Sequence, residues 1–208
     1  LNLCAQDECK AAVCRYPGAL RLLSSLLFAA APLNQVAAML LSSLAEKDSC
    51  AVALTDSNCD LALLECLSSA VNEILVEKIL ECLLKLTQFA VCRSVLWQEE
   101  RLKRLLSTSR VDVCIVIQHL AEEAKGRRAL KKAGAVHFLR PFLNTAFKEA
   151  AAALWNLTAE EDCALELCRS EGVVPLLAHA GSCEALGTLL QMSAQEEVIQ
   201  QLYEQNAV

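Results

Sequence analysis

Residues 147–177 read FKEAAAALWNLTAEEDCALELCRSEGVVPLL, and this stretch contains the boundaries of three successive helices. Its first eleven residues are rich in alanine and leucine and lack glycine and proline, which favours a helix over 147–157. Thr158 followed by Glu161 has the spacing of a capping box, so we expect a second helix to begin there. Gly172 predicts the end of that helix in a left-handed conformation, and Pro175 fits the first turn of a third helix.

The same pattern recurs along the whole chain. Asn156 lies between apolar residues and precedes a small one, and we call a polar residue in this setting an anchor. The equivalent anchors, 34 to 42 residues apart, are Asn2, Ser43, Lys85, His119 and Gln191. A helix-stop residue follows most anchors after fifteen or sixteen positions, at Gly18, Asn58, Gly134, Gly172 and Asn206. A period of this length with three helices per repeat predicts an α-solenoid without strands.

The predicted repeats form one array and span 4–45, 46–87, 88–121, 122–159 and 160–194, with a partial sixth repeat at 195–208. The third repeat has Glu100 and Arg101 where the stop residue should be, so we expect 97–106 to continue as one helix or to bend without a clean break. A second capping box, at Ser193 and Glu196, predicts the start of the last helix. Because both ends of the sequence fall inside a repeat, we expect a fragment of a longer protein.

At this point the residues resemble a known family. The stretch ALWNLTAEEDCALELCRSEGVVPLL is similar to the armadillo repeat, in which helix 3 ends in Leu-x-Asn-Leu and a small residue, and helix 1, a glycine and a short helix 2 follow. The resemblance is most specific over 116–194 and extends to YPGALRLLSSLL in the first repeat. It implies an all-α, right-handed solenoid of about five full repeats and a partial sixth. It also implies that a protein or peptide binds in a concave groove lined by helix 3.

In the armadillo family, anchor asparagines can bond the backbone of an extended peptide, because an amide offers both a donor and an acceptor. Here asparagine stands only at Asn2 and Asn156, and Ala152 stands where peptide-binding members of the nuclear import type carry tryptophan. These departures disfavour a regular ladder for one extended peptide and leave open a local pocket around His119, Asn156 and Gln191. The candidate groove residues are Lys85, Asp112, His119, Glu149, Trp155, Asn156, Glu184 and Gln191. The helical period also places Ile115, Val116, Ala152 and Thr188 on this face. The alternative is that the anchors are ordinary polar surface residues.

Charge is distributed unevenly, although the net charge of the chain is only −6. Residues 93–148 hold twelve Lys and Arg against five Asp and Glu, whereas 149–208 hold one against ten. The candidate secondary basic patch consists of Arg127, Arg128 and Lys131, and it would attract an acidic partner. Solvated charge that complements a helix dipole is the alternative interpretation. Overall acidity and the lack of interleaved aromatic residues disfavour nucleic acid as a partner.

Twelve cysteines occur without any C-x-x-C pair. Cys9, Cys50, Cys92 and Cys163 all lie seven residues after an anchor, and Cys14 and Cys168 lie twelve after one. Cysteine at a fixed repeat position is typical of a small apolar packing residue. We therefore expect reduced thiols, no metal and no cofactor, and a reducing compartment, which means the cytoplasm with the nucleus as the other choice.

No catalytic constellation is apparent. His119, His137 and His179 lie outside metal-ligand spacings, and the glycines form no phosphate-binding loop. No apolar run is long enough to span a membrane. We therefore expect no enzyme but a protein-interaction module, such as a scaffold, an adaptor or a co-chaperone. The alternatives are cargo recognition by the basic third and fourth repeats, or a structural spacer or dimerising segment. The partner and the oligomeric state are left open by the sequence.

Overall fold

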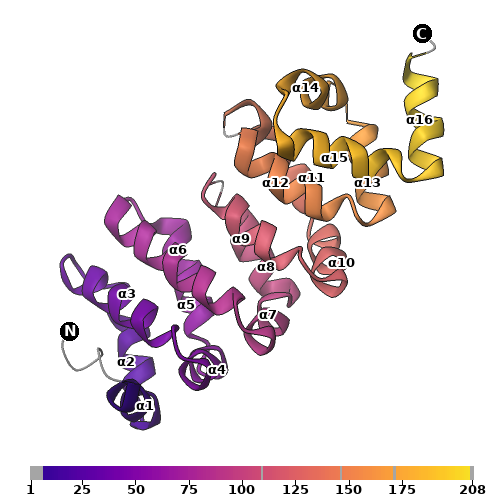
Figure 1. Cartoon of the computed structure of the whole chain (residues 1–208). Coiled ribbons are helices and arrows are strands. Elements are labelled where there is room, and N and C mark those ends of the chain that lie inside the picture. Colours follow the sequence, from indigo (N-terminus) through magenta and orange to yellow (C-terminus); the bar gives the residue numbers. More distant parts are fainter. Residues whose placement is uncertain (1–6, 109, 146, 171, 207–208) are drawn as a thin grey trace. The chain divides into compact units, whose positions relative to one another are not determined.

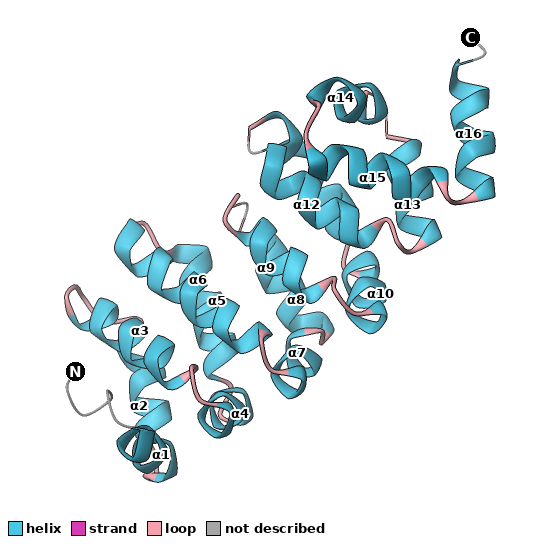
Figure 2. Ribbon diagram, in the orientation of Figure 1, coloured by secondary structure: helices cyan, strands magenta, loops and turns pink. Residues whose placement is uncertain are grey.

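The computed structural model describes residues 7–108, 110–145, 147–170 and 172–206. Within these residues every regular element is a helix, which confirms the all-α prediction (Figure 2). The chain forms two compact units, Leu1–Thr108 and Ser109–Val208, which we call the N-terminal and the C-terminal unit. The boundary between them falls inside the predicted third repeat. The prediction of one continuous array stays a prediction, and Asn2 and Cys4 lie outside the described residues.

The N-terminal unit contains eight helices in the part that the structure describes (Figure 1). They are α1 (Asp7–Arg15), α2 (Ala19–Leu26), α3 (Leu33–Leu44), α4 (Asp48–Asp56), α5 (Cys59–Ser69), α6 (Glu73–Thr87), α7 (Ala90–Leu96) and α8 (Glu99–Ser107). Helices α3 and α6 are the third helices of the first two repeats, and they pack along one another. Each helix also contributes fully buried leucines to the core of the unit, among them Leu41 of α3 and Leu83 of α6.

The C-terminal unit repeats this arrangement with two further pairs of third helices. Its described elements are α9 (Val113–Leu120), α10 (Ala124–Lys132), α11 (Ala135–Leu139), the 3-10 helix η2 (Arg140–Asn144), α12 (Phe147–Leu157), α13 (Glu161–Cys168), α14 (Val173–Ala180), α15 (Cys183–Ser193) and α16 (Glu196–Asn206). Helix α12 packs between α9 and α15. No helix among the described residues has the length and hydropathy to cross a membrane.

The predicted helix stops are confirmed at four positions. Gly18, Gly134 and Gly172 have φ values of 82°, 84° and 77°, and Asn58 has a φ of 56°. Each residue directly precedes the second helix of its repeat. Glycine and asparagine tolerate this left-handed backbone, which most other residues avoid. Local backbone chemistry therefore sets these boundaries.

In the third repeat, α8 runs without interruption from Glu99 to Ser107 and so covers most of the range 97–106 that was expected to continue as one helix, and a turn at Trp97 and Gln98 separates it from α7. Helix α7 ends at Leu96, Gln98 is extended with ψ 142°, and α8 begins at Glu99. The side chain of Arg101 joins this break to the preceding repeat. Its Nη1 donates to Gln98 Oε1 at 2.6 Å and its Nη2 donates to Asn58 Oδ1 at 3.0 Å. Side-chain hydrogen bonds to Gln98 and Asn58 thus hold the start of α8 in place, in a repeat that has no glycine there.

Both predicted capping boxes are wrong. The hydroxyl of Thr158 donates to Trp155 O at 3.0 Å, and that of Ser193 donates to Leu190 O at 2.9 Å. The residue at the N-cap of α13 is Glu160, whose side chain makes no capping hydrogen bond. Hydroxyl groups at a helix end can bond the carbonyl three residues earlier instead of the next helix.

The cysteines pack as the repeat positions predict, with two exceptions. The eleven cysteines that the structure describes are free thiols, and eight of them are buried, including Cys50, Cys92, Cys163 and Cys168. Cys9 and Cys14 are only half-buried. Burial raises the pKa of Cys163 to about 12, so this thiol stays protonated at neutral pH.

Candidate functional site

The anchor residues of the third helices are buried to a similar extent. Ser43, Lys85, His119, Asn156 and Gln191 are all half-buried. The residue four positions before each anchor is also on the surface in α3, α6, α9 and α12. The residue three positions before the anchor is buried in α6, α9, α12 and α15, and for this reason the predicted face residues Val116 and Thr188 are fully buried. The sequence period alone could not fix this rotation, because neighbouring helices determine it.

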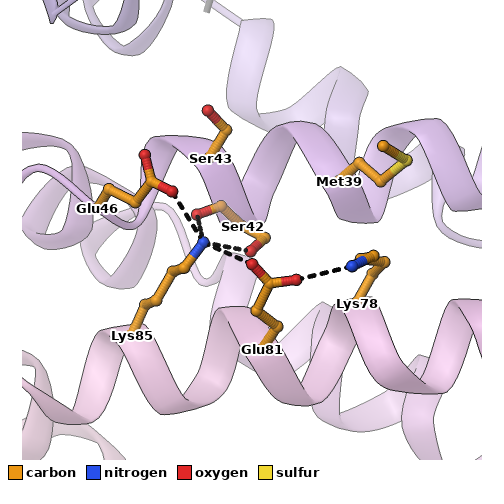
Figure 3. A pocket seen from close by; sticks show the side chains of 7 residues that line it. All are labelled: Met39, Ser42, Ser43, Glu46, Lys78, Glu81 and Lys85. Carbon is orange, nitrogen blue, oxygen red and sulfur yellow. Dashed lines mark hydrogen bonds and ion pairs between the residues drawn. The ribbon is translucent and has the colours of Figure 1, made fainter. Parts of the chain in front are cut away.

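In the N-terminal unit a small polar pocket lies between α3 and α6 (Figure 3). It has a volume of about 140 Å³ and is lined by Met39, Ser42, Ser43, Glu46, Lys78, Glu81 and Lys85. The anchor Lys85 fills its centre, where Nζ lies 2.7 Å from Glu81 Oε1 and 3.0 Å from Glu46 Oε1. The same ammonium group donates to Ser42 Oγ at 3.0 Å and to Ser42 O at 3.3 Å.

Two further lysines complete this ionic network. Lys78 Nζ donates to Glu81 Oε2 at 3.0 Å, and Lys10 Nζ donates to Glu46 Oε2 at 2.5 Å. Hydrogen bonds from Lys85, and more weakly from Lys78, lower the pKa of Glu81 to about 2. Burial alone would lower the pKa of Lys85, but hydrogen bonds to both carboxylates raise it. Each charge in the pocket is thus balanced from within the unit.

The anchor of α12 also bonds its own chain. Asn156 Nδ2 donates to Gln118 O at 3.0 Å, in the last turn of α9. Lys85 makes the equivalent bond to Ser42 O in the last turn of α3. Carbonyls in the last turn of a helix lack helical partners and carry the negative end of its dipole. Both anchors therefore cap the preceding third helix, and one of the two N–H donors of Asn156 is used within the unit.

The other two anchors of the C-terminal unit remain available. Among the described residues, no hydrogen bond involves the side chains of His119 or Gln191. The carboxylates of Glu149 and Glu184, on the same helix faces as Asn156 and Gln191, likewise form no ion pair within the described part of the chain. Asp112 lies 3.7 Å from Arg110 Nη2 and is thus partly neutralised.

Trp155 lies across the neighbouring helix. An ideal Cβ on Gly187 would lie only 2.5 Å from Cδ2 and Cε2 of the Trp155 ring, so only glycine leaves room for the indole there. Gly187 is four residues before the anchor Gln191, and the helical period places Glu184 on the same face. The indole is 43% exposed. The C-terminal unit therefore presents an aromatic surface over Gly187, on a helix face that also carries Gln191 and Glu184, for which the described residues provide no side-chain partner.

The basic patch is largely engaged with its own unit. Arg127 Nε lies 3.4 Å from Glu160 Oε1, Arg128 Nε lies 3.6 Å from Glu160 Oε2, and Lys131 pairs with Asp162. Lys131 and Lys132 occupy the last turn of α10, where a positive charge complements the helix dipole. All three residues of the predicted patch thus lie within ion-pair distance of Glu160 or Asp162, at the start of α13.

His137 and His179 do not contribute to a group of metal ligands either. His179 Nδ1 lies 2.7 Å from Pro175 O, and His137 is exposed on α11. Within the described residues, no group of three or more His, Cys, Asp or Glu side chains is placed to hold a metal ion. Sequence reasoning missed Ser42, Glu46 and Gly187. The spacing of Gly187 from its anchor was the signal available for it.

Solved structures of similar fold exist, although no protein-family model and no curated protein matches the sequence. A computationally designed armadillo repeat protein for modular peptide recognition superimposes with a TM-score of 0.72 at 19% identity, covering 91% of this chain and 88% of that one. A designed armadillo repeat protein in complex with the peptide (KR)4 gives a TM-score of 0.69 at 17% identity, covering 96% and 88%. The chain therefore has an armadillo-like α-solenoid fold.

Proposed function

We propose that this chain is a protein-interaction module, a scaffold or adaptor, that binds an extended basic segment of a partner protein. The binding surface is the third-helix face of the C-terminal unit, from α9 to α15. The observation that carries the proposal is the contact of the Trp155 indole with Gly187, on a helix face that also carries Gln191 and Glu184. An exposed aromatic face, an amide and a carboxylate are groups that hold a peptide backbone and a cationic side chain.

The charges on this face favour a basic ligand over an acidic one. Glu149 and Glu184 carry negative charge without an ion pair among the described residues, and residues 149–208 hold ten acidic residues against one basic. A lysine or arginine side chain placed there would gain charge-assisted hydrogen bonds. One similar solved structure, the designed protein mentioned above, is itself in complex with the peptide (KR)4, which supports this ligand class.

A specific observation supports a second candidate function, that of a structural spacer or dimerising segment. Lys85 and Asn156 each donate a hydrogen bond to a carbonyl of the same unit. Glu149 and Glu184 also lie in the first turns of their helices, where the helix dipole stabilises carboxylates without any ligand. A spacer would bind no peptide on this face.

A co-chaperone role and a cytoplasmic or nuclear site of action are further parts of the first proposal, that of a protein-interaction module.

The test is calorimetric titration with an octapeptide of alternating lysine and arginine. Glu184→Gln and Gln191→Ala change side chains that form no hydrogen bond or ion pair with other side chains in the described part of the protein, so the fold should be unaffected. Loss of a charge-assisted hydrogen bond should weaken binding roughly tenfold in each variant. Ser43→Ala, the anchor exchange in the N-terminal unit, is the control and should leave affinity unchanged. Tight binding of an octapeptide of glutamate and aspartate instead would assign the site to the basic patch on α10.

A further inference from the structure

A second pocket of the N-terminal unit lies between the first two repeats, at the corner where the first helix of each repeat turns into the second. It has a volume of about 550 Å³, which is in the range of ligand-binding pockets. One wall is the turn from α1 to α2, and the other is the turn from α4 to α5. We call it the corner pocket, and the polar side chains that line it are Arg15, Tyr16, Arg21, Asp56, Ser57 and Asn58.

Arg15 occupies a repeat position that faces the following repeat. It lies three residues before the helix-stop residue of the first repeat. The equivalent residue of the second repeat is Thr55, whose hydroxyl lies 3.9 Å from Sγ of Cys92 in the third repeat. That of the fourth repeat is Lys131, which pairs with Asp162 in the fifth. Arg15 therefore faces the second repeat, which forms the other wall of the pocket.

Arg21 occupies a position that neighbouring repeats leave uncovered. It lies three residues after the helix-stop residue, and the equivalent residues Leu61 and His137 are both at least partly exposed. Helix α5, which carries Leu61, packs against α2 on one side and α8 on the other. Exposure at this position is therefore a property of the repeat and does not require a missing neighbour.

The two arginines of the corner pocket have no anionic partner in the described part of the chain. Arg15 Nε donates to Ala11 O at 3.1 Å within its own helix, and its two Nη atoms make no hydrogen bond to a described residue. Arg21 forms neither a hydrogen bond nor an ion pair among these residues. Asp56 is the one carboxylate in the pocket lining, and it pairs with neither arginine. The lining thus holds two positive charges against one negative charge.

At other corners of the fold, a basic residue is paired with a carboxylate of the same chain. Arg101 pairs with Asp60, and Lys131 pairs with Asp162. In the corner pocket, Asn58 accepts a hydrogen bond from Arg101 through Oδ1, which leaves its amide N–H groups as donors. The corner pocket is therefore rich in donors and lacks the paired carboxylate found at these other corners.

We propose that the corner pocket binds a carboxylate group in an acidic segment of a partner protein. The guanidinium groups of Arg15 and Arg21 donate to its oxygens, as Arg101 does to Asp60 within the chain. A single carboxylate balances the one positive charge that the lining has in excess, whereas a phosphate group would exceed it.

The ligand is a chain segment because the pocket is open, with most of its lining residues exposed. No lining residue belongs to a third helix. The proposal therefore concerns a separate surface and stands whether or not the third-helix face of the C-terminal unit binds a basic peptide.

The test uses a fluorescently labelled hexapeptide of glutamate, whose binding is followed by anisotropy at low ionic strength. Arg15→Gln with Arg21→Gln should weaken binding by roughly tenfold to a hundredfold, because charge-assisted hydrogen bonds are lost. Lys103→Gln with Arg104→Gln is the control, since it removes the same charge from the surface of the same unit, and it should change the affinity by at most about twofold. Asp56→Asn removes the carboxylate of the lining and should strengthen binding by roughly threefold.

Four results would overturn the proposal. The arginine variant binds the peptide as tightly as the unchanged protein does, or the control weakens binding as much as the arginine variant. Loss of binding in an Arg127→Gln, Arg128→Gln variant would assign the acidic ligand to the basic patch on α10. Displacement of the peptide by free glutamate at a similar concentration would show that the ligand is a small carboxylic acid.

The third-helix face is kept apart from this test by one further variant. Glu184→Gln with Gln191→Ala should bind the glutamate hexapeptide normally, although it should bind the lysine-arginine octapeptide less tightly. Failure of the corner-pocket proposal and failure of the proposed function are therefore distinguishable.

Discussion

Substitution of Arg101 by methionine should destabilise the N-terminal unit more than any exchange on its surface. The guanidinium pairs with the carboxylate of Asp60, and the two side chains are 7% and 0% exposed. Asp60 Oδ1 already accepts no hydrogen bond within the described residues. Removing one partner of a buried ion pair costs about 3–5 kcal/mol, because the other charge stays buried without compensation. Asn58 and Gln98 would lose their donor as well.

Urea unfolding followed by circular dichroism measures this cost. For an m-value of about 2 kcal/mol/M, a loss of 3–5 kcal/mol lowers the midpoint by roughly 2 M. Arg104→Met is the matched control on the same helix. Arg104 is 40% exposed and its ion pairs with Glu65 and Glu100 span 3.5 Å and 3.3 Å, so its loss should cost less than about 1 kcal/mol.

A second variant separates the buried charge from simple loss of packing. Asp60→Asn combined with Arg101→Met leaves no buried charge, so most of the lost stability should return. If Arg101→Met lowers the free energy of unfolding by no more than Arg104→Met does, the buried ion pair does not stabilise the third repeat. If the double variant is as unstable as the sum of its single exchanges, the cost comes from packing and not from the unpaired carboxylate.

Four further outcomes are expected. Replacing Gly134 or Gly172 by valine should lower the free energy of unfolding in urea by about 1 kcal/mol or more, because the left-handed backbone at these positions disfavours a residue with a Cβ. No change in stability would mean that the helix boundary lies elsewhere. Gly187→Ala should shift Trp155 and change its emission spectrum, and an unchanged spectrum would contradict the close contact. Because the pKa of Glu81 is lowered to about 2, its contribution to stability is complete above about pH 4.5 and is lost as the pH falls toward 2. Lys85→Met should therefore flatten the dependence of the free energy of unfolding on pH in this range. An unchanged pH dependence would mean that another group is responsible for it. A native thiol titration with mass mapping should modify exposed Cys183 well before buried Cys82 and Cys114, and the reverse order would refute the burial.

Features that depend on a few neighbouring residues could be predicted from the sequence. The left-handed stops at Gly134 and Gly172 follow from the conformational freedom of one residue. The burial of Cys163 and Cys168 follows from their repeat position. The i,i+4 ion pair of Glu81 and Lys85 likewise lies within one helix.

Features that depend on contacts between repeats could not be predicted. The break before α8 relies on Arg101 and Asp60, which are 41 residues apart. The burial of Thr188 depends on how α15 is rotated against α12, where its hydroxyl donates to Ala151 O at 3.2 Å. The engagement of Asn156 with the carbonyl of Gln118 depends on the same packing, and one repeat read alone does not contain it.

The most direct test of peptide binding on the third-helix face uses Trp155 as its own reporter. In a Trp97→Phe background the indole of Trp155 is the remaining tryptophan of the chain. Titration with the lysine-arginine octapeptide should change its emission in a saturable way, and Glu184→Gln should shift the midpoint to roughly tenfold higher peptide concentration. An emission that stays constant while calorimetry detects binding, or a midpoint that Glu184→Gln does not move, would contradict the assignment of the site to this face.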